Sequence, residues 1–148
     1  MSTIETIARG VCINNNHLLL CRSRGGGAVS YLPGGHIEFQ EQARTALERE
    51  IMEELGQPSR AGRFLGCCEH TFIQKGEPHA EINLVFELDI STINTNTPPA
   101  ACEAWISFFW QPLAQLEESD LQPAELRQTI TQWLQNAGFA TSGDLWCN

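Results

Sequence analysis

The chain has 148 residues, of which 42% are hydrophobic and 18% charged, a composition typical of globular proteins and not of disordered chains. This length predicts one domain, over residues 1–148, with a core of its own. The formal net charge is −9, because 18 acidic side chains outnumber 9 lysines and arginines. Such a charge argues against a nucleic-acid polymer as partner, since binding a phosphate backbone requires a basic face. It suits a protein that gathers carboxylates around a divalent cation, and it equally serves plain solubility.

The sequence shows no segment that would direct the chain to a membrane. Met1–Gly10 lacks the apolar core of a secretory signal. The longest apolar runs, near Leu18–Cys21 and Ile106–Trp110, are too short to cross a bilayer. We therefore expect a cytoplasmic protein with no membrane partner. Its six cysteines form no C-x-x-C pair, so we expect reduced, buried thiols and neither disulfides nor a zinc site.

The N-terminal part of the chain predicts a β-hairpin. Strands are expected over Ile4–Ile13 and His17–Ser23, both rich in apolar residues. Asn14–Asn16 forms the turn between them, because asparagine tolerates left-handed backbone geometry. A flexible break follows at Arg24–Gly27, and Tyr31–Gly35 then leads into a segment of different character.

The C-terminal part predicts further strands and a closing helix. The expected strands are Arg63–Gln74, Ala80–Ile90 and Glu103–Trp110, with loops at Gln74–Pro78 and Thr95–Ala101. The helix begins at Pro123 and ends at Gly138. Its apolar stripe consists of Leu126, Ile130, Trp133 and Leu134. Strands and two helices in mixed order predict the α/β class, with a mixed sheet in an α/β/α sandwich.

The other helix, expected over Gln40–Leu55 with Gly56 as its stop signal, has an apolar and an acidic side. Its buried stripe is Leu47, Ile51 and Leu55, which recur every fourth residue. Glu50, Glu53 and Glu54 share a neighbouring face. Their mutual repulsion is tolerable if the face is solvated or if it holds a cation, and carboxylate oxygens suit Mg²⁺. The glutamates alone do not decide between these two cases.

The residues around this helix strengthen the metal hypothesis. Gly34 and Gly35 allow the backbone to approach an ion without a Cβ in the way, and their carbonyls are further candidate ligands. Glu41 comes early in the predicted helix, and Arg49 lies two turns later on a similar face. This spacing allows a structural link between the loop and the helix.

The whole segment resembles the Nudix family, whose box reads G-x5-E-x7-R-E-U-x-E-E-x-G-U with U aliphatic. Eight of its nine fixed positions are matched, and Gln57 replaces the aliphatic residue at the last one. The matching residues are Gly35, Glu41, Arg49, Glu50, Ile51, Glu53, Glu54 and Gly56. Trp110–Leu113 also resembles the W-x-P-L segment found before the closing helix in such domains.

The resemblance implies roles for these residues. Glu50, Glu53 and Glu54 would bind the metal together with the backbone of Gly34 or Gly35, and Glu53 or Glu50 would act on the attacking water. Glu41 and Arg49 would be the structural pair. Glu103, as a catalytic carboxylate, and Glu81, on the substrate side, are candidates from outside the box. Arg22 and Arg24 are the candidate phosphate contacts, and Tyr31, Phe39 and Phe72 are the aromatic candidates for stacking on a base.

The resemblance further implies a Mg²⁺-dependent hydrolase, with Mn²⁺ as a second candidate ion, that cleaves a phosphoanhydride bond in a nucleoside diphosphate linked to another group. Nucleoside triphosphates, ADP-ribose, nucleotide sugars and dinucleoside polyphosphates all fit that description. A Nudix-like regulatory module that binds nucleotides without catalysis is the alternative, and an unrelated acidic scaffold is a third reading. A homodimer is left open, because family members are often dimers and no feature of this sequence demands it.

Overall fold

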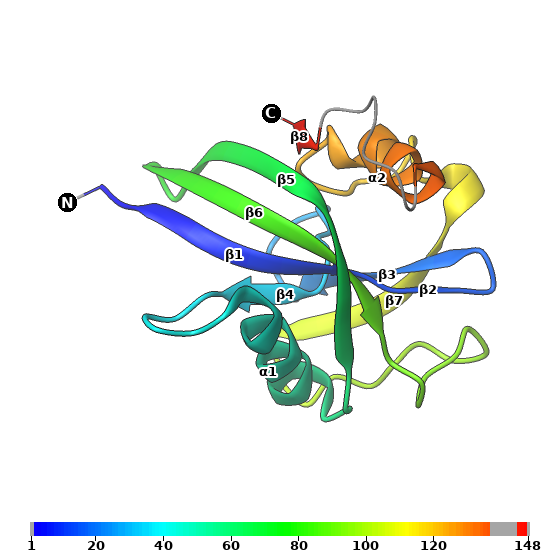
Figure 1. Ribbon diagram of the computed structural model, residues 1–148. Helices are drawn as coiled ribbons and strands as arrows, with labels where there is room; N and C mark the ends of the chain where they lie inside the picture. Colours follow the sequence, from blue (N-terminus) through cyan, green and yellow to red (C-terminus); the bar gives the residue numbers. More distant parts are fainter. Residues whose placement is uncertain (1, 137–144, 148) are drawn as a thin grey trace.

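The computed structural model describes residues 2–136 and 145–147 as two sheets and two α-helices (Figure 1). The larger sheet has the strand order β4-β1-β6-β5-β8. Its strands are β1 (Ile4–Val11), β4 (Gly34–His36), β5 (Arg60–Gln74), β6 (Glu77–Asp89) and β8 (Trp146–Cys147). It is mixed, because β1 runs parallel to β6 and antiparallel to β4. The smaller sheet, β2-β3-β7, consists of β2 (Ile13–Asn14), β3 (His17–Ser23) and β7 (Ile106–Pro112).

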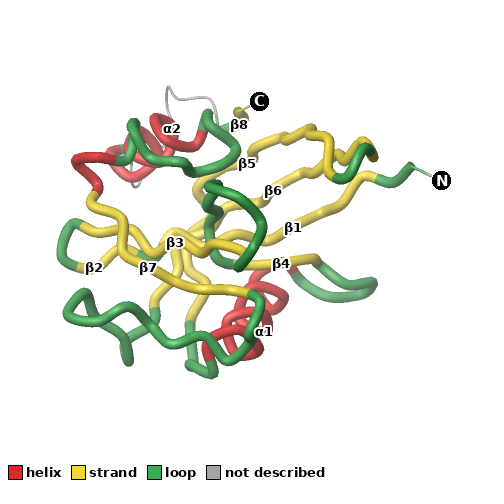
Figure 2. Tube along the Cα trace, turned by 180° about the vertical axis from the view of Figure 1, so that it is seen from behind, coloured by secondary structure: helices red, strands yellow, loops and turns green. Residues whose placement is uncertain are grey.

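Two helices cover the sheets from opposite sides, α1 (Ala43–Leu55) and α2 (Leu126–Gln135), as Figures 1 and 2 show from two directions. A short 3₁₀ helix, η1 (Leu113–Gln115), follows β7. Each helix closes its own hydrophobic core. In β3, Leu19 belongs to the core under α1 while Leu18 and Leu20 belong to the core under α2, because successive side chains of a strand point to opposite faces. The predicted α/β class with a mixed sheet between helices is confirmed.

Helix α1 packs as its sequence predicts but begins later. Leu47, Ile51 and Leu55 are at most 2% exposed, and Gly56 ends the helix with φ 64° and donates its N–H to the carbonyl of Met52. The prediction that the helix starts at Gln40 is wrong. Gln40 has φ 66°, so its backbone is left-handed and interrupts the helical path despite its good helix propensity.

Helix α2 docks through the predicted stripe. Leu126, Ile130 and Trp133 are buried, and Trp133 packs against β5 at Gly66, where a Cβ would lie 2.3 Å from the indole Cζ2. The helix begins at Leu126 and not at Pro123, which lies in the preceding turn. The expected end at Gly138 falls outside the described residues.

Several strand boundaries differ from the predictions. The expected loop Gln74–Pro78 is a tight turn at Lys75 and Gly76, both with positive φ, so Glu77 and Pro78 belong to β6. Strand β5 begins at Arg60, and β7 begins at Ile106 and not at Glu103. The predicted turn consists of Asn15 and Asn16, which have positive φ, whereas Asn14 belongs to β2. The turn joins β2 to β3, and β1 ends at Val11.

The tail and the cysteines complete the fold. β8 pairs in parallel with β5, and the indole nitrogen of Trp146 donates to the carboxylate of Glu69 at 2.9 Å. Four cysteines, Cys12, Cys21, Cys67 and Cys68, are buried as expected, whereas Cys102 is exposed and Cys147 is half-buried. In the part of the chain that the structure describes, none of the helices has the length and apolar character needed to span a membrane.

Candidate functional site

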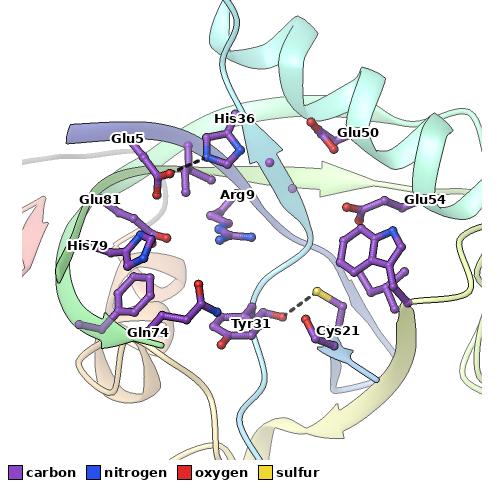
Figure 3. Close-up of a pocket in the computed structure, with 17 residues that line it drawn as sticks. Glu5, Arg9, Cys21, Tyr31, His36, Glu50, Glu54, Gln74, His79 and Glu81 are labelled. Atoms are coloured by element: carbon purple, nitrogen blue, oxygen red, sulfur yellow. Dashed lines mark hydrogen bonds and ion pairs between the residues drawn. The ribbon is translucent and has the colours of Figure 1, made fainter. Parts of the chain in front are cut away.

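A cavity of about 420 Å³ lies between helix α1 and strands of both sheets (Figure 3). Helix α1 contributes Glu50 and Glu54, and β4 contributes its two glycines and His36. The remaining lining side chains are Glu5, Ile7 and Arg9 of β1, Phe72 and Gln74 of β5, His79 and Glu81 of β6, Cys21 and Ser23 of β3, Tyr31, Trp105 and Ile106. Strands far apart in the sequence therefore surround two carboxylates of one helix.

The glycines of β4 let the carboxylates of α1 come close to the sheet. A Cβ on Gly35 would lie 2.4 Å from Cδ of Glu50, and a Cβ on Gly34 would lie 1.9 Å from the carbonyl oxygen of Ala8. Gly34 also has φ 141°, a backbone conformation that favours glycine. Any larger residue at Gly35 would thus occupy the space into which the Glu50 carboxylate projects.

Glu54 is the most buried carboxylate of the site. It is 5% exposed, and its Oε2 has no hydrogen-bond partner in the described structure. Burial and then the negative charge of Glu50 raise the pKa of Glu54 to about 8, while the nearby Arg9 opposes the shift. A buried oxygen without a partner costs free energy unless a ligand satisfies it.

Arg49 links the loop before α1 to the helix. It forms a two-pronged ion pair with Glu41, at 2.8 Å from Nε to Oε2 and 3.0 Å from Nη2 to Oε1, and this contact lowers the pKa of Glu41 to about 2. Nη2 also donates to the carbonyl of His36 at 3.0 Å. Glu41 lies before the first residue of α1 and not early in the helix, as the sequence predicts. The pair nevertheless makes the predicted link between the loop and the helix.

Arg49 also contacts two of the three glutamates predicted to bind the metal. Its Nη1 donates to Glu50 at 2.9 Å and to Glu53 at 3.3 Å. Glu53 has a side chain that is 54% exposed, and it does not line the cavity. Among residues 2–136 and 145–147, no three acidic, histidine or cysteine side chains converge closely enough to form a metal cluster. The predicted triad is therefore arranged as Glu50 and Glu54 facing the cavity, with Glu53 beside them.

Of the candidates outside the box, Glu81 lines the cavity and the other three do not. Arg22 pairs with Asp120 at 2.6 Å and stacks on the ring of Phe109, so its charge is already neutralised elsewhere. Arg24 is exposed in the turn after β3. Glu103 is exposed in the loop before β7, although its charge contributes to the raised pKa of Glu54. Of the aromatic candidates, Tyr31 and Phe72 line the cavity, whereas Phe39 is 93% exposed and does not.

Sequence reasoning missed Arg9, Glu5 and Trp105, and gave no weight to His36 or His79. A signal for Arg9 was present: it interrupts the apolar run of β1, where Ala8 and Gly10 on either side are buried. Glu5, Ile7 and Arg9 lie on the same face of β1, because every second side chain of a strand points the same way, and all three line the cavity. His36 is paired with Glu5, with Nε2 3.4 Å from Oε1. No pattern within β1 indicates which other strands would line the cavity opposite these side chains.

Known proteins resemble this chain in both sequence pattern and fold. A family model described as the NUDIX domain matches residues 5–134. The crystal structure of a MutT protein from Methanosarcina mazei Go1 is 18% identical, with a TM-score of 0.68 over 93% of this chain and 98% of that one. A UDP-X diphosphatase is 17% identical, with a TM-score of 0.65 over 100% of this chain and 68% of that one. An ADP-ribose pyrophosphatase from Streptococcus suis 89-1591 is 14% identical, with a TM-score of 0.60 over 99% and 100%. At these identities the structures show a shared fold, and the family model covers most of the chain: the chain belongs to the NUDIX hydrolase family.

Proposed function

We propose that the chain is a Mg²⁺-dependent pyrophosphohydrolase that cleaves a phosphoanhydride bond in a nucleoside diphosphate linked to another group. The observation that carries the proposal is the pair Glu50 and Glu54 at the cavity wall, with one Glu54 oxygen buried and unpartnered. The negative charge of Glu50 raises the pKa of Glu54, and a cation beside the two carboxylates would relieve this repulsion. The charge of the pair and the orphaned oxygen together favour a cation as the natural ligand of this wall.

The donors at this wall fit a hard divalent ion. Glu50 and Glu54 supply carboxylate oxygens, Glu53 lies one turn away from Glu50, and the backbone of Gly34 or Gly35 adds carbonyl oxygens. The space beside Gly35, which a Cβ would fill, is where the Glu50 carboxylate lies. When bound, Mg²⁺ would neutralise charge on the phosphate oxygens and make a water molecule more acidic, and Mn²⁺ would serve the same purpose.

The chain's own carboxylates would handle the proton. A water oxygen bonds to phosphorus, the bridging P–O bond breaks, and the proton of the water passes to a base. Glu54, whose pKa is about 8, is a poor acceptor at neutral pH before a cation binds. Glu50, which faces the cavity, and Glu53 and Glu103, which are more exposed, are the proposed bases. Substitution of each of them by glutamine distinguishes a base from a metal ligand. Loss of a ligand raises the Mg²⁺ concentration needed for half-maximal activity, whereas loss of the base lowers the rate without that change.

The proposed substrates form a class of nucleotides and not a single compound. The cavity volume of about 420 Å³ accommodates a nucleotide-sized ligand. The similar structures are described as acting on UDP-X in one case and on ADP-ribose in another, so the fold is compatible with different groups on either side of the pyrophosphate. We include nucleoside triphosphates, ADP-ribose, nucleotide sugars and dinucleoside polyphosphates in the proposal.

The test is release of nucleoside monophosphate from this panel in Mg²⁺, in Mn²⁺ and in EDTA. We expect turnover of at least one compound that EDTA abolishes, and loss of most of it in Glu54→Gln. Glu118→Gln is the matched control, because Glu118 is exposed and outside the cavity. Absence of metal-dependent turnover on the entire panel would exclude the proposal.

A further inference from the structure

Arg9 is placed by the sheet at the centre of the cavity. It lies in β1 between two buried residues, Ala8 and Gly10, so strand alternation turns its side chain to the face that Glu5 and Ile7 share. Figure 3 shows its guanidinium in the middle of the cavity, with Glu50 and Glu54 on one side and Glu81 and His79 on the other. Among the described residues that line the cavity, Arg9 is the only arginine or lysine.

The guanidinium is held in one orientation by neutral acceptors. Its Nε donates to Oδ1 of Asn83 at 3.2 Å, and its Nη1 donates to the carbonyl of Leu32 at 3.0 Å. Asn83 is 1% exposed, and its own Nδ2 donates to the carbonyl of Cys68 and to Glu81, both at 3.3 Å. A buried amide with three hydrogen bonds thus fixes the plane of the arginine. Two of the five N–H donors are used, and the remaining ones are available to a ligand.

No carboxylate of the described residues forms a direct ion pair with Arg9. In the described part of the chain, Arg22, Arg49 and Arg63 each form an ion pair with a carboxylate, whereas no ion pair joins Arg9 to one. A guanidinium without a direct carboxylate partner keeps N–H donors for a phosphate, and a cation beside the carboxylates of α1 would offset their repulsion of that phosphate. Its planar fork matches the two oxygens of a phosphate.

We propose that Arg9 is a phosphate-binding residue that holds, through its free N–H groups, the substrate phosphate lying away from the carboxylates of α1. The inference rests on the proposed function and deepens it: the substrate carries two adjacent phosphate groups, one facing Glu50 and Glu54 and the other facing Arg9. Because Asn83 and Leu32 orient the guanidinium beforehand, little side-chain freedom remains to be lost when the phosphate binds. Arg9 would thus fix which phosphate reaches the reacting position.

Titration of the purified protein with inorganic pyrophosphate, by calorimetry in Mg²⁺ and again in EDTA, tests the proposal. Arg9→Gln removes the charge and the planar fork but keeps an N–H donor on a shorter side chain. We expect it to weaken pyrophosphate binding about tenfold or more, in line with the loss of a charge-assisted pair. Arg60→Met is the control, because Arg60 is exposed and outside the cavity and the variant loses the same charge. Its affinity is expected to stay within about twofold, since only screened long-range charge is lost.

Arg9→Lys separates the fork from the charge. We expect intermediate affinity, because an ammonium makes a point contact where the guanidinium makes two parallel ones. If Arg9→Gln does not fold, the lysine variant decides alone. Unchanged affinity in the folded Arg9 variants, with only a lower Tm, would mean that Arg9 is structural and would overturn the proposal, as would a lack of pyrophosphate binding by the unsubstituted protein in both buffers.

The outcomes also distinguish this proposal from the function on which it rests. Arg9-dependent pyrophosphate binding without turnover of any compound on the panel would remove the proposed function and keep the phosphate site. If the unsubstituted protein shows metal-dependent turnover and Arg9→Gln leaves KM and pyrophosphate affinity unchanged, the proposed function stands and the phosphate site at Arg9 is overturned.

Discussion

Gly35 faces the carboxylate of Glu50 so closely that a Cβ on the glycine would lie 2.4 Å from Glu50 Cδ. Gly35→Ala must therefore push this carboxylate away from the cavity wall. We expect metal-dependent activity to fall by about tenfold to a hundredfold, because small displacements of a catalytic group are costly. The far-ultraviolet circular dichroism should be unchanged, since Gly35 has no positive φ.

Gly62→Ala is the control for that substitution, because the nearest atom to its added Cβ is 3.5 Å away, an ordinary contact. Full activity in Gly35→Ala, measured beside this control, would show that the Glu50 position does not matter for the reaction.

Glu54 gives a prediction for stability against pH. Its pKa is raised from 4.5 to about 8 in the folded protein, so between these values the unfolded chain releases a proton that the folded protein keeps. The contribution of Glu54 to the free energy of unfolding should then fall as pH rises from 4.5 to 8 and level off above it. In EDTA, Glu54→Gln should be more stable than the unsubstituted protein at pH 8, by roughly 1–3 kcal/mol, and nearly equal to it at pH 4.

Urea unfolding at both pH values measures this difference. Added Mg²⁺ should raise the Tm of the unsubstituted protein by mass action and raise that of Glu54→Gln much less. If the two proteins show the same pH dependence in EDTA, Glu54 is not the buried acid that its surroundings indicate.

The ion pair of Glu41 and Arg49 has the opposite pH dependence. The pKa of Glu41 is lowered from 4.5 to about 2, so its contribution to stability is present above pH 4.5 and is lost as pH falls toward 2. Glu41→Gln should lower the Tm at pH 7, with the difference shrinking as the pH falls below 4.5. Thermal unfolding followed by circular dichroism tests this, with Glu118→Gln as the exposed control, and a constant difference across the range would contradict it.

The contact of Trp133 with β5 predicts the effect of filling a small space. A Cβ on Gly66 would lie 2.3 Å from Cζ2 of Trp133 and 2.6 Å from the carbonyl of Leu145, so Gly66→Ala must separate α2 from the sheet. We expect a loss of about 1–3 kcal/mol of unfolding free energy, the usual cost of overpacking. The same substitution at Gly62 should have a much smaller effect, and equal losses at the two sites would indicate a general glycine effect.

The local structure of helix α1 could largely be predicted from the sequence, but the contacts between distant strands that complete the site could not. The acidic face of α1, its buried stripe and its glycine end follow from spacing along one element, which a single sequence displays directly. The role of Arg9 depends on β1 lying beside β6, whose Glu81 and Asn83 are more than seventy residues away in the chain. No periodicity within either strand encodes that pairing.

Other differences come from competition between local preferences. Gln40 has good helix propensity, yet its backbone is left-handed in the turn that precedes Glu41, whose carboxylate pairs with Arg49. Arg22 lies where the sequence predicts a phosphate contact, but Asp120, nearly a hundred residues later in the chain, neutralises its charge. Tertiary contacts decided both cases.

Strand β3 gives the fold a property that neither helix provides alone. Leu18 and Leu20 belong to one core and Leu19 and Cys21 to the other, so four successive side chains serve two separate interiors. A slip of one residue along β7 would exchange the two sets and leave both interiors filled with the wrong shapes. The two halves of the molecule are thereby coupled through a single strand, and heat or denaturant should disrupt them together, in one cooperative transition.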